Sequence, residues 1–262
     1  MKELAIHQVD AFATRAFEGN PAAVCILDAW LPDALMLAIA AENNLAETAF
    51  AIKQGATYGL RWFTPTTEVP LCGHATLATA HVLFTEFGVT DAVLRFETQS
   101  GELRVERGGE GRLNLDFPAV PNEPIAEPAG LAEALGTPLL AVHRGRYLMC
   151  ELESAAAVSA LKPDFSLLAK IPFNVIVTAP GEGPYDFVSR FFALPVGVAE
   201  DPVTGSAHCE LTPFWAKRLG KTKLSARQLS ARGGDVGCEL RGDRVQLTGS
   251  AVTVLRGHLL LP

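Results

Sequence analysis

The chain lacks the apolar segments that would place it in a membrane. Nowhere in its 262 residues does an apolar run approach the roughly twenty residues that span a bilayer. The N-terminal residues 1–4 also lead into no long apolar region of the kind that a secretory signal carries. We therefore expect a cytoplasmic protein with no membrane partner.

Cysteine is scarce and is not arranged for cross-linking. The chain has five cysteines, an odd number, and no two of them have C-x-x-C spacing. This excludes a disulfide framework or a structural zinc site as the basis of the fold. The histidines match no recognised ligand motif, so no metal is expected.

Clusters of positive charge are missing as well. The 22 Lys and Arg residues are scattered, and 29 Asp and Glu residues give a formal net charge of -7. Nucleic acids and anionic surfaces attract concentrated Lys and Arg, so we expect no nucleic acid partner. What remains, 48% apolar and 19% charged residues, is typical of a globular protein of one large domain or two modest ones.

A pattern that recurs at a fixed distance divides the chain in two. Pro-x-x-Gly-x-Ala begins at Pro70 and again at Pro202, an offset of 132 residues, and residues 112–115 repeat at 244–247 with the same offset. A period of half a chain indicates a duplicated domain rather than a short-repeat solenoid. The polar, proline-rich segment after residue 117 lies where the halves should meet, so we expect domains at 1–117 and 118–262.

Each half combines a strong helix with many short strands. Helices are expected at 32–43, 75–84, 125–135 and 163–169, and a further helix is expected after the second repeat, ending at Gly220. Pro213 fits within this last helix only in its first turn or at a kink. Strands are expected at 4–12, 22–27, 48–52, 58–63, 92–98, 101–107, 111–117, 139–142, 147–152, 174–178, 187–192, 223–226, 228–231, 235–240, 244–248 and 251–255. The alternation predicts an α+β fold in which each half is a curled, mostly antiparallel sheet around a central helix.

Two helix starts and one acidic residue form the candidate site. A strand that enters a helix through Gly73 or Gly205 leaves unpaired backbone N–H groups, which together with the helix dipole favour a carboxylate. Glu47 lies where a helix ends and a strand begins, and burial in a dry cleft is expected to raise its pKa toward the range useful for proton transfer. The same helix dipole is expected to keep His74 neutral.

The chain resembles the phenazine-biosynthesis (PhzF-like) isomerase family in five motifs that follow one another in order. They are VDAF with FEGNPAAV from Val9, NLAETAF from Asn44, RWFTP from Arg61, LCGHAT from Leu71 and EDPVTGSAH from Glu200. The resemblance covers essentially the whole chain. It implies a diaminopimelate-epimerase-like fold, an active site in the cleft between two pseudo-symmetric halves, no cofactor, no metal, and usually a homodimer. It also implies that the last strand, 251–262, can pack back on the first half.

The resemblance assigns roles to four side chains. Glu47 matches the general acid/base that moves a proton between carbons of a small unsaturated amino or carboxylic acid. His74, Asp201 and Ser206 match residues that hold this carboxylate-bearing substrate and position the transfer. Without the resemblance, Glu47 fits a surface ion pair, and Asp201 and Ser206 fit helix-capping residues.

The residue before each glycine turn helps to distinguish an isomerase from a two-base racemase. Epimerase relatives use two opposed cysteines at the positions that Cys72 and Thr204 hold here, so a two-base racemase would lack one thiol. Cys72 borders the substrate side of Gly73 and also fits a small buried apolar residue. An isomerase is therefore the first hypothesis. The alternatives are a metabolite-binding protein without catalysis and an amino-acid racemase that uses Cys72 with Glu47. The substrate itself does not follow from the sequence, and phenazine synthesis is only one option.

Overall fold

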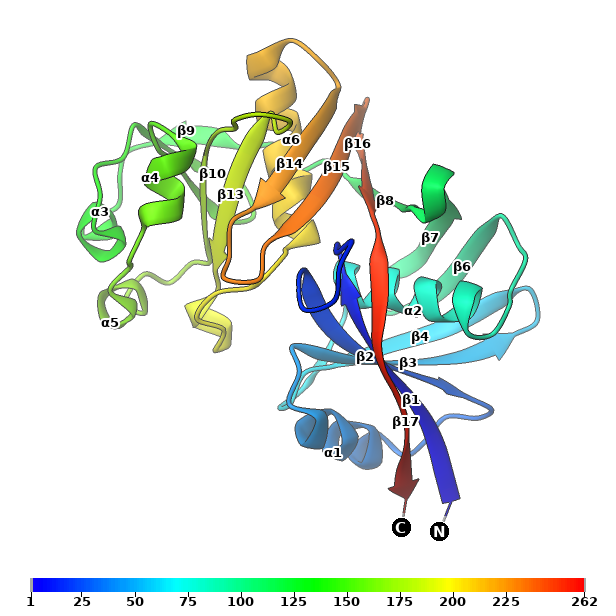
Figure 1. Cartoon of the computed structure of the whole chain (residues 1–262). Helices are drawn as coiled ribbons and strands as arrows, with labels where there is room; N and C mark the ends of the chain where they lie inside the picture. Colours follow the sequence, from blue (N-terminus) through cyan, green and yellow to red (C-terminus); the bar gives the residue numbers. More distant parts are fainter. Residues whose placement is uncertain (1, 262) are drawn as a thin grey trace. The chain divides into compact units, whose positions relative to one another are not determined.

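The chain folds into two compact units. The computed structural model describes residues 2–261. Unit 1 comprises Met1–Asp116 and Thr248–Pro262, and unit 2 comprises Phe117–Leu247. The chain returns to unit 1 at its end, because β17 (Ala251–Leu261) pairs antiparallel with β1 (Lys2–Ala11), as the red and blue strands in Figure 1 show.

Unit 1 is built from strands around one helix. Its further elements are β2 (Asn20–Leu27), α1 (Asp33–Asn43), β3 (Glu47–Gln54), β4 (Thr57–Phe63), β5 (Glu68–Val69), α2 (Gly73–Thr85), β6 (Val93–Thr98), β7 (Gly101–Arg107), a 3-10 turn (Gly109–Gly111) and β8 (Leu113–Pro118). Strands β2 and β3 are parallel, as are β4 and β6. The pairs β1–β2, β3–β4, β6–β7 and β7–β8 are antiparallel. The helices expected at 32–43 and 75–84 are confirmed.

Helix α2 is the centre of unit 1. Nine of its residues between His74 and Leu83 are buried, and it contacts β1, β2, β3, β7 and β17. A helix that is apolar on all sides is stable only when it is enclosed, and the small residues of this helix let the strands approach closely. Its first turn is therefore held in a rigid surrounding.

Unit 2 has the same sequence of strand pairings around a second buried helix. Its elements are β9 (Glu123–Ile125), α3 (Leu131–Leu135), β10 (Ala141–Arg144), β11 (Leu148–Glu151), α4 (Ala155–Ala160), α5 (Phe165–Leu168), β12 (Val175–Pro180), β13 (Phe187–Phe192), a 3-10 turn (Leu194–Val196), α6 (Gly205–Leu219), β14 (Lys223–Gln228), β15 (Gly234–Arg241) and β16 (Arg244–Gly249). Strand β11 is parallel to β12, β12 antiparallel to β13, and β13 parallel to β14. In unit 1 the series β2, β3, β4, β6 has the same order of directions.

Pro213 lies inside helix α6, neither in its first turn nor at an end. Proline has no N–H to offer the carbonyl four residues earlier, that of Cys209. That carbonyl instead accepts a hydrogen bond of 3.0 Å from the backbone N–H of Val120. A segment distant in the sequence thus replaces the bond that the helix cannot make.

The helix expected at 125–135 is wrong in its first half. Only Leu131–Leu135 is helical, whereas Glu123–Ile125 forms strand β9 and pairs antiparallel with β10. Proline is tolerated in an edge strand such as this one, where its missing N–H interrupts no inner ladder. The strand expected at 228–231 is also wrong, because β14 ends at Gln228. Helix α4 was not expected.

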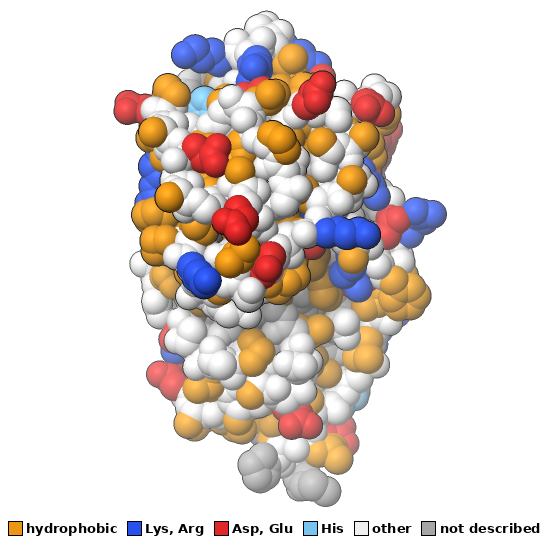
Figure 2. Space-filling view, turned by 90° about the vertical axis from the view of Figure 1, so that its left-hand side faces the viewer, with side chains coloured by type: hydrophobic (Ala, Val, Ile, Leu, Met, Phe, Trp, Pro, Cys, Tyr) orange, Lys and Arg blue, Asp and Glu red, His pale blue; other side chains and the backbone are white. Residues whose placement is uncertain are grey.

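The surface carries mixed charge. On the face drawn in Figure 2, Lys and Arg side chains are interspersed with Asp and Glu and with single apolar residues. In the described part of the chain, no helix is both long and apolar enough to cross a membrane. All five cysteines lie within that part, and each is buried and free of disulfide bonds.

Candidate functional site

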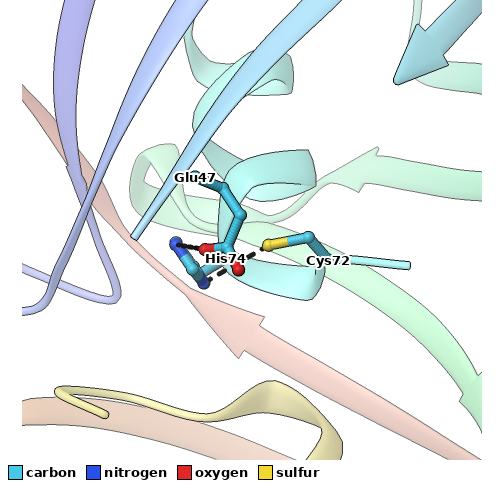
Figure 3. Close-up of side chains that lie close together, drawn as sticks. All are labelled: Glu47, Cys72 and His74. Atoms are coloured by element: carbon cyan, nitrogen blue, oxygen red, sulfur yellow. Dashed lines mark hydrogen bonds and ion pairs between the residues drawn. The ribbon is translucent and has the colours of Figure 1, made fainter. Parts of the chain in front are cut away.

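Three of the predicted residues meet at the start of α2 in unit 1, and we call them the Glu47 cluster: Glu47, Cys72 and His74 (Figure 3). Nε2 of His74 lies 3.1 Å from Oε2 of Glu47. Nδ1 of His74 lies 3.5 Å from Sγ of Cys72. The imidazole thus stands between a carboxylate on one side and a thiol on the other.

The local backbone explains why these side chains converge. Helix α1 ends at Asn44, which adopts the left-handed conformation (φ 49°) and turns the chain. Strand β3 then starts at Glu47, paired with Ala22 of the parallel strand β2, so the expected place of Glu47 between a helix and a strand is confirmed. Cys72 is the N-cap of α2, and its side chain accepts no capping hydrogen bond from the helix, so the thiol can lie against His74.

Glu47 is an ionised carboxylate rather than a neutral acid. Burial raises the pKa of Glu47, but the opposite charge of His74 and hydrogen bonds from His74 and Cys72 outweigh it, so the net pKa is lowered. The expectation of a raised pKa is therefore wrong. It took account of the dry surrounding and not of the cationic partner 3.1 Å away.

His74 is correspondingly favoured in its charged form. Burial lowers the pKa of His74, yet the neighbouring Cys72 and Glu47 raise it well above its usual value. The expectation that the helix dipole keeps this ring neutral is wrong, because a carboxylate in contact outweighs the partial charge of a helix end. Burial and the nearby Glu47 raise the pKa of Cys72 to about 11, so its thiol keeps its proton at neutral pH.

The three side chains of the Glu47 cluster are all of types that can also bind a metal ion. Among residues 2–261, Glu47, Cys72 and His74 are the only three side chains of metal-binding type whose ligand atoms all lie within 4.8 Å of one another. However, His74 directs one ring nitrogen to Glu47 and the other to Cys72.

One contact of the cluster was missed in the sequence. Asn20, the first residue of β2, is fully buried, and its Nδ2 lies 3.2 Å from Nδ1 of His74. In the sequence Asn20 reads as part of the turn before a strand. A buried polar residue next to a glycine turn is the signal that could have found it.

The other predicted residues, Asp201, Gly205 and Ser206, lie in unit 2 at the start of α6. The N-cap of this helix is Thr204, not Ser206, and its hydroxyl donates a hydrogen bond to the carboxylate of Asp201. Gln228, fully buried, accepts from the N–H of Thr204 at 2.9 Å and donates to the carbonyl of Asp201 at 2.7 Å. The turn is thereby fixed from the neighbouring strand, through a residue that sequence reasoning missed.

Ser206 also has a partner that was not predicted. Its hydroxyl lies 2.9 Å from the phenol oxygen of Tyr147. The backbone N–H of Tyr147 donates to Oε1 of Glu210 at 3.0 Å, and Glu210 is fully buried one helical turn after Ser206. Burial raises the pKa of Glu210 to about 7, against opposing hydrogen bonds from the Tyr147 and Arg146 backbone. An acidic residue within a buried helix was the available signal.

Comparisons with known proteins agree along the whole chain. A family model described as phenazine biosynthesis-like protein (PhzC-PhzF) matches residues 9–257. An uncharacterized isomerase of Pseudomonas aeruginosa is 53% identical over 261 residues, with 99% of each chain covered.

Solved structures agree as well. A crystal structure of a phenazine biosynthesis protein of the PhzF family from Enterococcus faecalis has 47% identity and a TM-score of 0.97, and the match covers 99% of this chain and 100% of that one. The structure of a probable proline racemase from Agrobacterium radiobacter is 11% identical with a TM-score of 0.66, over 99% of this chain and 93% of that one. This last likeness is one of fold alone.

Proposed function

The chain belongs to the family of phenazine biosynthesis-like proteins, and from this premise we propose that it is a cofactor-independent isomerase. It moves a proton between carbons of a small unsaturated amino or carboxylic acid, with Glu47 as the general acid/base. The resemblance seen in the sequence is confirmed, and so is the expected α+β, diaminopimelate-epimerase-like fold. The activity and its mechanism are the proposal.

The Glu47 and His74 pair is the observation that carries this proposal. An ionised carboxylate can take a proton from carbon, as a general base must. Once Glu47 is protonated, the charged ring of His74, 3.1 Å away, disfavours the neutral form of the carboxyl group. Glu47 therefore readily returns the proton to the substrate. A single residue can thus serve first as base and then as acid.

The negative charge that develops on the substrate needs stabilisation at the same place. His74 can supply a charged N–H donor, and the first backbone N–H groups of α2, beginning at Gly73, add partial positive charge. In unit 2 we propose that Asp201 and Ser206 bind polar groups of the substrate, with the N–H groups of α6 from Gly205 onward. A carboxylate is a suitable ligand for a helix start of either kind.

The geometry gives less support to a racemase. Two-base racemisation needs an acid and a base on opposite faces of one carbon, whereas Cys72 and Glu47 belong to one cluster with ligand atoms within 4.8 Å. The high pKa of the thiol, about 11, further removes Cys72 from the role of base. A protein that only binds its ligand would have no evident use for this pair. Placing buried His74 and partly buried Glu47 together as charges costs free energy.

Two further expectations belong to the same proposal. Unit 1 pairs Arg61 with Glu68 through two hydrogen bonds, and unit 2 pairs Arg190 with Glu200 in the same way. Together with the shared strand directions, this supports an internal duplication.

A cytoplasmic homodimer is the assembly we propose, and light scattering after size-exclusion chromatography tests it.

The proposed chemistry is tested by NMR on a panel of cyclic dienyl and simple amino acids. Wild type, Glu47→Gln and the matched control Glu42→Gln, which removes an exposed carboxylate of α1, are compared at equal concentration. We expect one or more compounds to be rearranged by wild type and the control and not by Glu47→Gln. Full turnover by Glu47→Gln would remove Glu47 from the mechanism.

A further inference from the structure

We propose that Asn20 is a positioning residue for His74: its amide serves as the hydrogen-bond partner of Nδ1 and thereby keeps Nε2 directed at Glu47. The inference concerns a contact that exists without substrate. Its importance for turnover rests on the proposed function.

The ring of His74 is held at both nitrogens. Nε2 lies 3.1 Å from Oε2 of Glu47 and Nδ1 lies 3.2 Å from Nδ2 of Asn20. In a neutral imidazole one nitrogen donates and the other accepts. When the Asn20 amide donates to Nδ1, the only ring proton is on Nε2, where the carboxylate can accept it.

An amide can also serve the charged ring. When both ring nitrogens carry protons, Nδ1–H needs an acceptor, and a half-turn of the Asn20 amide puts its oxygen in place of its nitrogen. The carboxylate of Glu47 from β3 and the thiol of Cys72 from the preceding turn are the titratable groups around this ring. Asn20, from β2, is the uncharged member that can follow either state without adding charge.

The conformation of the loop before Asn20 fixes the position of this side chain. Phe12 and Phe17 both have positive φ, 57° and 72°, a conformation that bulky L-residues adopt only where the surroundings enforce it. The carboxylate of Asp10 accepts the N–H of Phe17 at 2.7 Å. Gly19 (φ 65°) presses so close to the carbonyl of Ala11 that a Cβ would lie 2.1 Å from its oxygen. Strain of this kind is commonly found next to functional groups.

The test is a pH titration followed by long-range 1H–15N correlation on protein labelled with 15N-histidine. This spectrum reports the protonation of each ring nitrogen. The chain has six histidines, and the loss of signals in His74→Asn assigns those of His74. Wild type is compared with Asn20→Asp, whose carboxylate can only accept hydrogen bonds, and with Asn20→Leu, whose side chain can neither donate nor accept them. The matched control is Asn114→Asp, the same change in unit 1 at a side chain that accepts from Thr248.

We expect Asn20→Asp to keep His74 doubly protonated to a pH at least one unit higher than wild type, a tenfold gain in proton affinity. Asn20→Leu offers Nδ1–H no amide acceptor, so we expect His74 to lose its second proton at a lower pH than in wild type. Asn114→Asp should match wild type. If the His74 shifts and midpoint in both Asn20 variants equal those of the control, the proposal is overturned.

A second measurement needs no substitution at Asn20 and covers the case in which these variants do not fold. In wild type labelled at asparagine, the side-chain amide signals of Asn20 should change with the same midpoint as His74. Amide signals that stay constant through that transition contradict the proposal. Neither measurement uses a substrate, so a failed search for isomerase activity leaves this result intact, and a negative result here leaves the role of Glu47 to its own test.

Discussion

Glu210 should make the protein less stable as the pH rises from acidic to neutral. Its carboxyl is fully buried, and burial raises its pKa from an ordinary 4.5 to about 7. The folded state then binds the proton more tightly than the unfolded state. The stabilisation is complete below pH 4.5 and is lost as the pH rises through about 7. A pKa difference of about 2.5 at about 1.4 kcal/mol for each unit corresponds to about 3 kcal/mol.

The perturbation that isolates this effect is Glu210→Gln, which keeps the size of the side chain and removes the titration. Free energies of unfolding are measured by urea denaturation at a series of pH values, for wild type, Glu210→Gln and the matched control Glu133→Gln, an exposed glutamate of α3. Between acidic pH and pH 8, wild type and control should lose about 3 kcal/mol relative to Glu210→Gln. Curves that run parallel for all three proteins would refute the reasoning.

Two further predictions concern Cys72 and Pro213. Burial raises the pKa of Cys72 to about 11. Iodoacetamide should therefore label this thiol at pH 7 about a hundredfold more slowly than an ordinary cysteine, and the labelling rate should rise with pH. Peptide mass spectrometry measures the rate, and fast labelling at pH 7 would contradict the raised pKa. Pro213→Ala should change the free energy of unfolding by less than about 1 kcal/mol, against about 3 kcal/mol for an ordinary proline within a helix, because Val120 already donates to the carbonyl of Cys209. Urea denaturation tests this, and a gain of the full amount would show that the replacement bond is worth little.

The sequence was sufficient wherever the pattern was local. Helix α2 follows a glycine turn and is built mostly of small and apolar residues on all of its faces, which favours a buried helix. Glu47 could be placed at its junction because Asn44 and the following β-prone run mark both sides of it. These two features bring three members of the candidate site together.

The remainder depends on partners that are distant in the sequence. Pro213 is acceptable within α6 only because Val120, far away in the chain, replaces the missing bond, and no local rule indicates this. The segment before Leu131 forms strand β9 because β10 offers it an edge, which outweighs its helical periodicity.

Charge was the least predictable property. Burial alone would raise the pKa of Glu47, which is partly buried. The opposite outcome follows from His74, which lies 27 positions after Glu47 in the chain and contacts it only in the fold. Distances of about 3 Å decide such pairs, and a sequence does not contain them. Asn20 and Glu210 were missed for the same reason, since their partners are set by packing.

The central claim is that Glu47 carries the proton between carbons, and deuterium incorporation tests it most directly. A compound that wild type rearranges is incubated in deuterated buffer with wild type or with Glu47→Gln, and each carbon is followed by NMR. The account predicts rearrangement with wild type, with deuterium at the carbon that gains the proton in those turnovers in which the proton held by Glu47 exchanges with the buffer. It predicts neither exchange nor rearrangement with Glu47→Gln at equal folding. Deuterium entering the same carbon at the wild-type rate in Glu47→Gln would contradict it.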